Sequence, residues 1–279
     1  MKLRSLLFVP ADRPERFAKA AASGADALII DLEDSVAPEK KAFGRDAVAE
    51  WLREGRGAAT FVRINPLDSG LADDDLAAVL PGCPDGVVLP KAEGAASVQA
   101  LLERMGDAPT QPPILPIATE TPAAIFQLGS YTVVSQHLAG LTWGAEDLPA
   151  AIGAATSRDP DGNYTAPYEM VRGLTLFAAH AAATAAIETV FPRIDAPDAL
   201  AAYVARARRD GFTGMMAIHP SQVEIINRGF TPTDEELAHA RAVIGAFDAN
   251  PGAGALKLDG KMIDRPHLIQ ARRLLEMAG

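Results

Sequence analysis

The amino-acid sequence predicts an α/β protein, a (β/α)8 TIM barrel with a C-terminal helical extension. Short apolar runs alternate with longer amphipathic or alanine-rich segments, as in a parallel sheet whose strands are joined by helices. The chain has 279 residues, which is enough for one such barrel. Acidic and basic side chains follow several of the apolar runs, at the ends where a barrel of this kind carries its chemistry.

Eight apolar runs are the expected strands. The first begins near the N-terminus and superficially resembles a signal peptide, but it passes directly into charged sequence without a small-residue cleavage site. An alanine-rich stretch, Ala178–Ala186, is expected to be helical. The expected strands are Leu3–Val9, Ala27–Asp31, Thr60–Asn65, Gly86–Lys91, Ile114–Glu120, Leu138–Trp143, Thr189–Phe191 and Gly214–His219.

Two regions exceed the eightfold alternation. Residues 145–166 are expected to form a loop that covers the active site. The barrel domain is predicted to span residues 1–231, and residues 232–279 follow as a separate extension with a helix, a glycine-rich connection and a final helix.

Composition excludes several classes of protein. The formal net charge of −10 argues against binding to nucleic acid or to an anionic membrane surface. No apolar run approaches the roughly 20 residues that a membrane span needs. The single cysteine, Cys83, rules out an internal disulfide and fits the reducing cytoplasm. The five histidines are scattered without the spacing of a zinc site.

Two carboxylates follow neighbouring expected strands. Glu120 ends the fifth run, and Asp147 comes shortly after the sixth. Taken singly, each would more often be a solvated or helix-capping group. As a pair at the barrel mouth they suit Mg²⁺, which often takes only one or two protein carboxylates and leaves room for water and substrate.

The segment Asp31-Leu32-Glu33-Asp34 ends the second expected strand, and Arg63 lies within the apolar third one. Three acids within four residues repel one another unless cations compensate them, so they are expected to hold Arg63 and Lys91; solvated acids in a loop are the alternative. A buried arginine needs an anionic partner. Arg63 therefore pairs with Glu33, or it binds a substrate carboxylate or a developing enolate.

These motifs together resemble the citrate lyase β-subunit-like CoA-ester lyases of the HpcH/HpaI aldolase superfamily, a group that includes malyl-CoA and citramalyl-CoA lyases. The matching pieces occur in the family's order over about residues 3–266. They are Arg4-Ser5-Leu6-Leu7-Phe8-Val9-Pro10, Asp31-Leu32-Glu33-Asp34, Val62-Arg63-Ile64-Asn65, Leu89-Pro90-Lys91, Glu120-Thr121-Pro122, Gly144-Ala145-Glu146-Asp147-Leu148, Ala217-Ile218-His219-Pro220 and Met262-Ile263-Asp264.

The resemblance implies roles for several residues. It implies Mg²⁺ (Mn²⁺ as the alternative metal) held by Glu120 and Asp147, and Arg63 in contact with an α-keto acid or enolate. Glu33, Asp34 and Lys91 would support these groups, and coenzyme A would lie along Phe8, Arg13 and Lys19. Spacing alone makes Asp264 a helix N-cap. The resemblance instead makes it the acid/base that reaches a neighbouring subunit's active site, with the extension as a lid between subunits of a homotrimer or hexamer.

The implied activity is reversible cleavage of a 3-hydroxyacyl-CoA, such as malyl-CoA or citramalyl-CoA, into acetyl-CoA and an α-keto acid. One alternative is an aldolase of the same superfamily that acts without CoA. Another is a citrate lyase β subunit that depends on an acyl-carrier partner. The sequence leaves the acyl group open, because one methyl group in a pocket changes specificity by only about 1–3 kcal/mol.

Overall fold

The computed structural model describes residues 1–54, 57–106 and 111–278. By internal contacts the chain divides into two compact units, Met1–Asn227 and Arg228–Gly279. The boundary falls within the helix α9 (Pro220–Phe230).

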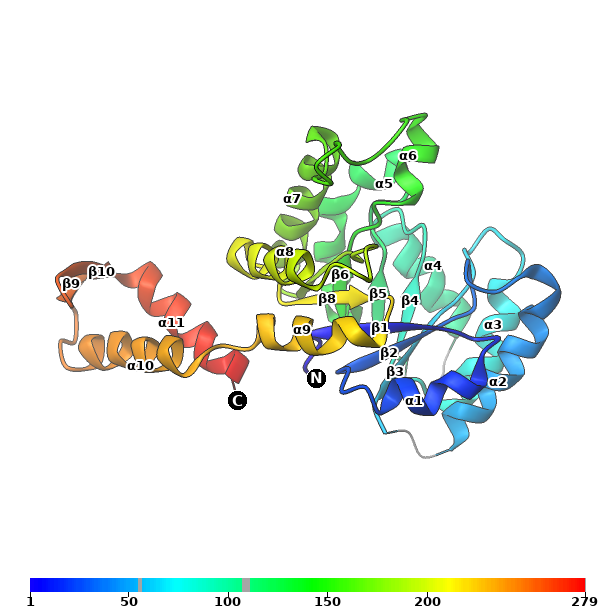
Figure 1. Ribbon diagram of the computed structural model, residues 1–279, viewed down its shortest axis with the longest axis horizontal. Helices are drawn as coiled ribbons and strands as arrows, with labels where there is room; N and C mark the ends of the chain where they lie inside the picture. Colours follow the sequence, from blue (N-terminus) through cyan, green and yellow to red (C-terminus); the bar gives the residue numbers. More distant parts are fainter. Residues whose placement is uncertain (55–56, 107–110, 279) are drawn as a thin grey trace. The chain divides into compact units, whose positions relative to one another are not determined.

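The first unit is built on a single sheet of eight parallel strands (Figure 1). The strands neighbour one another in the order β5-β4-β3-β2-β1-β8-β7-β6. Isolated parallel bridges, Ile114 with Leu138 and Ile117 with Thr142, join the two ends of this order. The strands therefore form a barrel, and the predicted fold class is confirmed. They are β1 (Ser5–Pro10), β2 (Ala27–Asp31), β3 (Ala59–Arg63), β4 (Gly86–Leu89), β5 (Ile114–Pro116), β6 (Gly140–Thr142), β7 (Ala185–Glu188) and β8 (Gly214–Ala217).

Helices follow the strands along the chain and surround the barrel (Figure 1). The α-helices are α1 (Phe17–Ala21), α2 (Lys41–Arg53), α3 (Ala72–Val79), α4 (Ala95–Met105), α5 (Pro122–Ile125), α6 (Asp147–Ile152), α7 (Ala166–Ala181), α8 (Pro197–Asp210) and α9 (Pro220–Phe230). Short 3-10 helices supplement them at η1 (Pro14–Arg16), η2 (Pro38–Lys40), η3 (Leu80–Gly82) and η4 (Leu128–His137). Residues 145–166, which were expected to form a loop over the active site, thus contain the helix α6.

Large apolar side chains from several strands fill the barrel interior. Phe61 on β3 is fully buried and pairs in register with Gly86 on β4. A Cβ atom at Gly86 would lie 2.1 Å from the Phe61 ring, so the ring occupies space that only a glycine leaves open. The same cluster contains Leu6, Ala27, Ile29, Val88, Leu115, Ile117, Ile187 and Met216.

The expected seventh strand at Thr189–Phe191 is wrong. The strand is Ala185–Glu188, and residues 189 and 190 already belong to the following loop. The helix predicted over Ala178–Ala186 ends at Ala181, after which Ala183 adopts a φ of 51°. Burial between β6 and β8 overrides the helix propensity of alanine there. The other expected strands overlap the observed ones.

The second unit contains a helix, a hairpin and a final helix. These are α10 (Asp234–Asp248), β9 (Ala255–Leu258), β10 (Lys261–Asp264) and α11 (Arg265–Ala278). Thr233 and Glu236 form a capping box at the start of α10. Asp259 and Gly260 turn the hairpin with φ values of 48° and 81°. Ala240, Val243, Phe247, Ile263 and Ala271 form the core of this unit.

Within the described residues, no helix combines the length and apolar character that crossing a membrane requires.

Candidate active site

A cavity of about 440 Å³ lies where the carboxyl ends of the strands meet. Glu120 and Asp147 both line it, as does Arg63. The remaining lining residues are Phe8, Pro10, Asp31, Asp34, Ser35, Ile117, Gly144, Ala145, Glu146, Thr189, Val190, Met216 and Ile218. The fold therefore gathers into one cavity groups that the sequence separates widely.

Arg63 is fixed on both sides by carboxylates. Its Nε and Nη2 donate to the two oxygens of Asp31 at 2.6 and 2.7 Å, and its Nη1 lies 2.9 Å from Glu33 Oε2. Its guanidinium carbon lies 5.0 Å from the centre of the Phe8 ring. Burial lowers the pKa of Arg63, but Asp31 and Glu33 raise it by more than burial lowers it. The net pKa is therefore above the ordinary value, and the guanidinium stays charged.

Asp31, one of the three acids expected to hold Arg63, accepts the two-pronged bond from that arginine. Burial opposes its ionisation, yet the hydrogen bonds from Arg63 more than offset this and leave the pKa of Asp31 below its ordinary value. The signal for this pair is the register of the sheet, in which Asp31 stands directly opposite Arg63. Glu33, which the sequence offered as a partner of Arg63 with substrate binding as the other possibility, is the second partner.

Lys91 contacts acidic groups that follow three different strands, β2, β5 and β6. Its Nζ lies 3.0 Å from Glu33 Oε1 and 3.7 Å from Asp147 Oδ1. Its backbone, in the left-handed region at a φ of 49°, donates its N–H to Glu120 Oε2 at 2.5 Å. Burial lowers the pKa of Lys91, but Glu33 and Asp147 raise it, and the net shift is upward. Lys91 therefore holds Glu120 through its backbone N–H and faces Asp147 with its side chain.

Glu33 and Asp34 differ in their surroundings. Glu33 is buried, and that burial raises its pKa despite the attraction of Arg63 and Lys91. Asp34 is exposed and lines the cavity. Lys41 supports the backbone between Asp31 and Asp34, since its Nζ donates to the carbonyl oxygens of Leu32 and Glu33 at 2.6 and 2.7 Å.

Glu120 is a buried carboxylate with an unusually high pKa. Burial, together with the nearby carboxylates of Glu33 and Asp147, raises the pKa of Glu120 to about 8. Its position is set by the next residue, because Thr121 caps α5 by accepting a hydrogen bond from the Ala124 N–H at 3.2 Å. A cation in the cavity would favour the ionised form of this group.

Gly144 makes room for Glu120. A Cβ atom at residue 144 would lie 2.6 Å from Glu120 Cγ and 3.2 Å from its Oε1. The glycine in the Gly144-Ala145-Glu146-Asp147 motif therefore has a specific steric reason. It lets the segment that carries Asp147 pass directly over the Glu120 side chain.

Glu120 and Asp147 suit a hard divalent cation that takes only one or two ligands from the protein. Glu120 is 4% exposed, whereas the Asp147 side chain is 36% exposed at the start of α6. In the described part of the chain, no group of three or more His, Cys, Asp or Glu side chains is arranged to hold a metal. Two carboxylates with open space beside them match Mg²⁺, which keeps several waters or substrate oxygens.

The residues expected to contact coenzyme A are less tightly grouped. Phe8 lines the cavity beneath Arg63. Arg13 lies outside the lining, half exposed, with its Nε 3.8 Å from Asp12 Oδ1. Lys19 is exposed on α1, also outside the lining. The coenzyme role of these three residues stays a prediction.

Asp264 belongs to the second unit. It ends β10 immediately before α11, in the position that its spacing indicated for a helix cap. Its Oδ1 lies 2.5 Å from His267 Nδ1, and the Asp264 side chain is 37% exposed. Its catalytic role also stays a prediction.

A barrel that gathers carboxylates and a fixed arginine in one cavity at its mouth has the features of an enzyme active site. The chain belongs to the HpcH/HpaI aldolase/citrate lyase family, whose pattern matches residues 4–220. The family assignment made from the sequence motifs is therefore confirmed, and it places the protein among carbon–carbon lyases and aldolases.

Relatives match over nearly the whole chain. A citrate lyase subunit beta-like protein of Mycobacterium tuberculosis H37Rv is 37% identical over 275 residues, covering 98% of this chain and 94% of that protein. A (3S)-malyl-CoA thioesterase of Cereibacter sphaeroides is 33% identical over 282 residues, covering 99% and 94%. The crystal structure of M. tuberculosis CitE with magnesium, acetoacetate and coenzyme A has a TM-score of 0.84 at 36% identity, covering 99% of this chain and 98% of that one.

Proposed function

We propose that the protein is a Mg²⁺-dependent CoA-ester lyase that reversibly cleaves a 3-hydroxyacyl-CoA, such as malyl-CoA or citramalyl-CoA, into acetyl-CoA and an α-keto acid. One observation carries the proposal. Glu120, Asp147 and the fixed Arg63 line a single cavity in a member of this family. The similar CitE structure, which holds magnesium, acetoacetate and coenzyme A, supports the same ligand classes here.

Glu120 and Asp147 would hold Mg²⁺, with Mn²⁺ as the alternative. When bound, the metal would supply Lewis-acid polarisation of the substrate's hydroxyl and carboxylate oxygens. Lys91 positions both carboxylates, through its backbone N–H on Glu120 and its Nζ near Asp147.

Arg63 would bind the carboxylate of the keto acid and the charge that develops as the C–C bond breaks. Each of its three nitrogens directs one N–H group at Asp31 or Glu33. Of the five N–H groups, the second ones on Nη1 and Nη2 are left for the substrate. Because these partners fix the guanidinium in advance, its orientation need not be organised during the reaction.

Asp264 would act as the acid/base. In cleavage the hydroxyl gives its proton to water, the bond between the hydroxyl-bearing carbon and the α-carbon of the thioester breaks, and its electron pair forms the acetyl-CoA enolate. Asp264, supplied by the C-terminal segment of a neighbouring subunit, would then protonate that carbon; in condensation it would remove the same proton. This role implies a homotrimer or a hexamer. Phe8, Arg13 and Lys19 would line the path of coenzyme A.

Substrate turnover by the purified protein tests the proposal against its rivals. Malyl-CoA and citramalyl-CoA are offered first, and the keto acid released identifies the acyl group. A CoA-independent aldolase would instead cleave free hydroxy-keto acids. A partner-dependent citrate lyase β subunit would turn over neither free ester, because its substrate is a thioester carried on an acyl-carrier protein.

Gly144→Ala is expected to lower kcat/KM by about a hundredfold, because a displacement of a reacting group by about 1 Å has that effect. The added methyl would lie 2.6 Å from Glu120 Cγ and must push that side chain aside. Steady-state kinetics and Mg²⁺ titration check this. Gly173→Ala is the control, since its new Cβ would meet no atom within 4 Å beyond its chain neighbours and the nearby backbone of its own helix. Equal activity in both variants would contradict the role of Gly144.

The affinity for Mg²⁺ is expected to rise with pH and to level off above about 8. The reason is that the pKa of Glu120 in the metal-free protein is about 8, so below that pH the metal must displace a proton. Calorimetric titration of Mg²⁺ in buffers of different ionisation enthalpy measures this release. An affinity that does not change from about pH 6.5 to about pH 9 would contradict it.

Asp264→Asn is expected to lower kcat by about a hundredfold to ten-thousandfold, the usual contribution of a general acid or base. Mg²⁺ affinity is expected to stay unchanged, because Glu120 and Asp147 are intact. Asp259→Asn is the matched control on the same hairpin, since asparagine tolerates the φ of 48° found there. Full activity of the Asp264 variant would exclude the acid/base role.

A further inference from the structure

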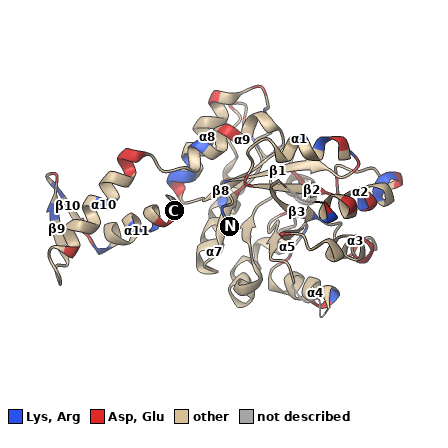
Figure 2. Ribbon diagram, turned by 90° about the horizontal axis from the view of Figure 1, so that it is seen from below, with Lys and Arg blue, Asp and Glu red and all other residues tan. Residues whose placement is uncertain are grey.

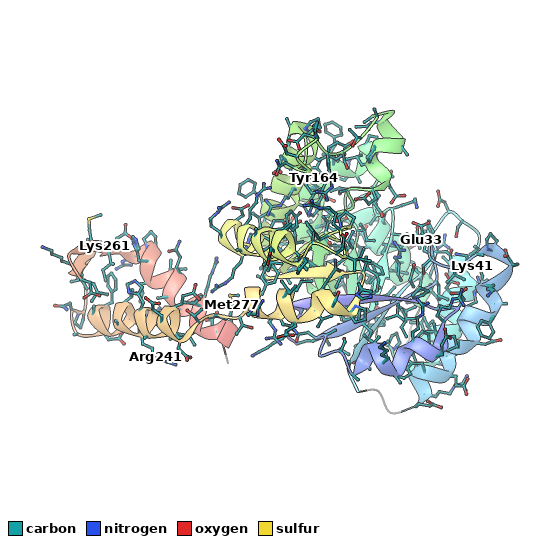
Figure 3. All side chains as sticks on the ribbon, viewed as in Figure 1. Glu33, Lys41, Tyr164, Arg241, Lys261 and Met277 are labelled. Atoms are coloured by element: carbon teal, nitrogen blue, oxygen red, sulfur yellow. The ribbon has the colours of Figure 1, made fainter. Side chains whose placement is uncertain are left out.

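A second cavity, of about 260 Å³, is lined by the segment that joins α6 to α7, by the loop between β7 and α8, and by α8. Arg158, Arg193 and Arg206 all line it, and so does Tyr164 (labelled in Figure 3). It shares no lining residue with the cavity that holds Glu120 and Asp147. Nothing in the proposed lyase reaction uses this cavity.

The three arginines differ in how their charges are compensated. Arg206, on the basic helix α8 (Figure 2), is paired with both oxygens of Glu169, one of them at 3.0 Å. Arg158 donates instead to uncharged groups, the Gly162 carbonyl at 2.9 Å and the Tyr164 hydroxyl. In the described part of the chain, neither Arg158 nor Arg193 forms an ion pair, although Asp161 also lines the cavity.

The two uncompensated guanidinium groups converge on Gly162. Arg158 Nη1 bonds to the Gly162 carbonyl, and a Cβ atom at Gly162 would lie 3.9 Å from the guanidinium of Arg193. Like charges in one place repel, and an anion between them removes that repulsion. The arrangement therefore favours a negatively charged ligand.

Aromatic rings hold both guanidinium groups. The Arg158 Cζ lies 3.8 Å from the centre of the Tyr164 ring, and the Arg193 Cζ lies 5.3 Å from the centre of the Phe191 ring. Tyr164 and Phe191 are themselves buried. Stacking of this kind occupies the face of a guanidinium and leaves edge N–H groups for a ligand, with less side-chain entropy to lose on binding.

We propose that this cavity binds a phosphate group through Arg158 and Arg193. The fork of N–H donors on arginine matches the oxygens of phosphate. The volume of about 260 Å³ is below the roughly 300 Å³ at which pockets for drug-sized ligands begin, so the cavity accommodates a phosphate group or a small phosphate ester.

The position of the cavity connects it to the candidate active site. Arg158 lies in the segment that joins α6, the helix that begins with Asp147, to α7, and Phe191 directly follows Val190, which lines the larger cavity. A phosphate bound to Arg158 and Arg193 would tie that segment to the loop between β7 and α8.

Titration with inorganic phosphate tests the proposal without any need for turnover, so its outcome is independent of the lyase assignment. Calorimetry or thermal stabilisation is measured in EDTA, with chloride at matched ionic strength as the reference. EDTA removes divalent metal, which would otherwise attract phosphate to Glu120 and Asp147. Arg63, which lines that cavity, and Lys91, whose side chain reaches Glu33 and Asp147, are already paired with carboxylates.

The full-length protein is expected to bind phosphate saturably, and Arg193→Gln is expected to weaken binding by about tenfold or more, the effect of losing a charge-assisted hydrogen bond. Arg193 is exposed, so this variant should fold normally, and Arg158→Gln is the second variant. Arg209→Gln is the matched control, on α8 but outside the lining and with a side chain that is 72% exposed. Absence of saturable binding, or equal affinity in the Arg193 and Arg209 variants, would overturn the proposal.

Discussion

Glu120→Gln is expected to lower kcat by about a thousandfold or more, because loss of a Lewis acid removes several kcal/mol of transition-state stabilisation. Glutamine keeps the shape of the side chain but supplies no charge for Mg²⁺. The metal-free variant should nevertheless be at least as stable as the parent. Burial raises the pKa of Glu120 to about 8, which means that the folded protein disfavours its charge.

Two measurements separate these effects. Thermal unfolding with and without Mg²⁺ should show a metal-induced rise in Tm for the parent and none for the variant. Glu93→Gln is the control, since Glu93 is an exposed carboxylate that accepts a hydrogen bond from Thr121 at 2.6 Å but lies outside the cavity lining. Retention of the Mg²⁺-induced shift in Glu120→Gln would mean that the metal binds elsewhere.

Arg63→Met is expected to reduce the free energy of unfolding by about 3–5 kcal/mol near neutral pH, because it leaves the buried carboxylate of Asp31 without its cation and leaves Glu33 with Lys91 alone. The loss should become smaller as the pH falls. In the parent, the lowered pKa of Asp31 gives a stabilisation that is present above the ordinary carboxyl pKa and is lost on acidification. Without Arg63, burial would raise the pKa of both Asp31 and Glu33, and protonation would relieve the variant. Denaturant unfolding at several pH values checks this.

Arg63→Lys separates catalysis from stability. Lysine keeps the positive charge but cannot reproduce the two-pronged bond to Asp31 together with the contact to Glu33. We expect kcat/KM to fall by about a hundredfold or more with Mg²⁺ affinity retained. The control is Arg4→Lys, which breaks a similar pair with Asp26 at the amino ends of β1 and β2. Equal loss of activity in both variants would mean that Arg63 has a structural role only.

The barrel was predictable because its strands are continuous apolar runs, buried on both faces. The prediction failed at β7, where Ala185 and Ala186 extend an alanine-rich run that reads as helix from local propensity alone. Only the neighbouring strands β6 and β8 make this segment a strand. That information is not local, so no window of the sequence contains it.

The carboxylates at the barrel mouth were predictable for a related reason, since parallel strands bring their carboxyl ends together. The bidentate pair of Asp31 with Arg63 depends on register, and the close approach of Gly144 to Glu120 depends on the path of a loop. Neither is encoded in spacing. The role of Asp264 came from resemblance alone, because its position before α11 reads as an ordinary helix cap.

Release of acetyl-CoA from malyl-CoA and citramalyl-CoA, followed in a coupled assay with Mg²⁺ and again with EDTA, tests the central claim most directly. The proposed function predicts release from at least one ester, its loss in EDTA, its return when excess Mg²⁺ is added, and none with Glu120→Gln. No release from either ester, or release that EDTA and the Glu120 substitution leave intact, would contradict a metal-dependent CoA-ester lyase.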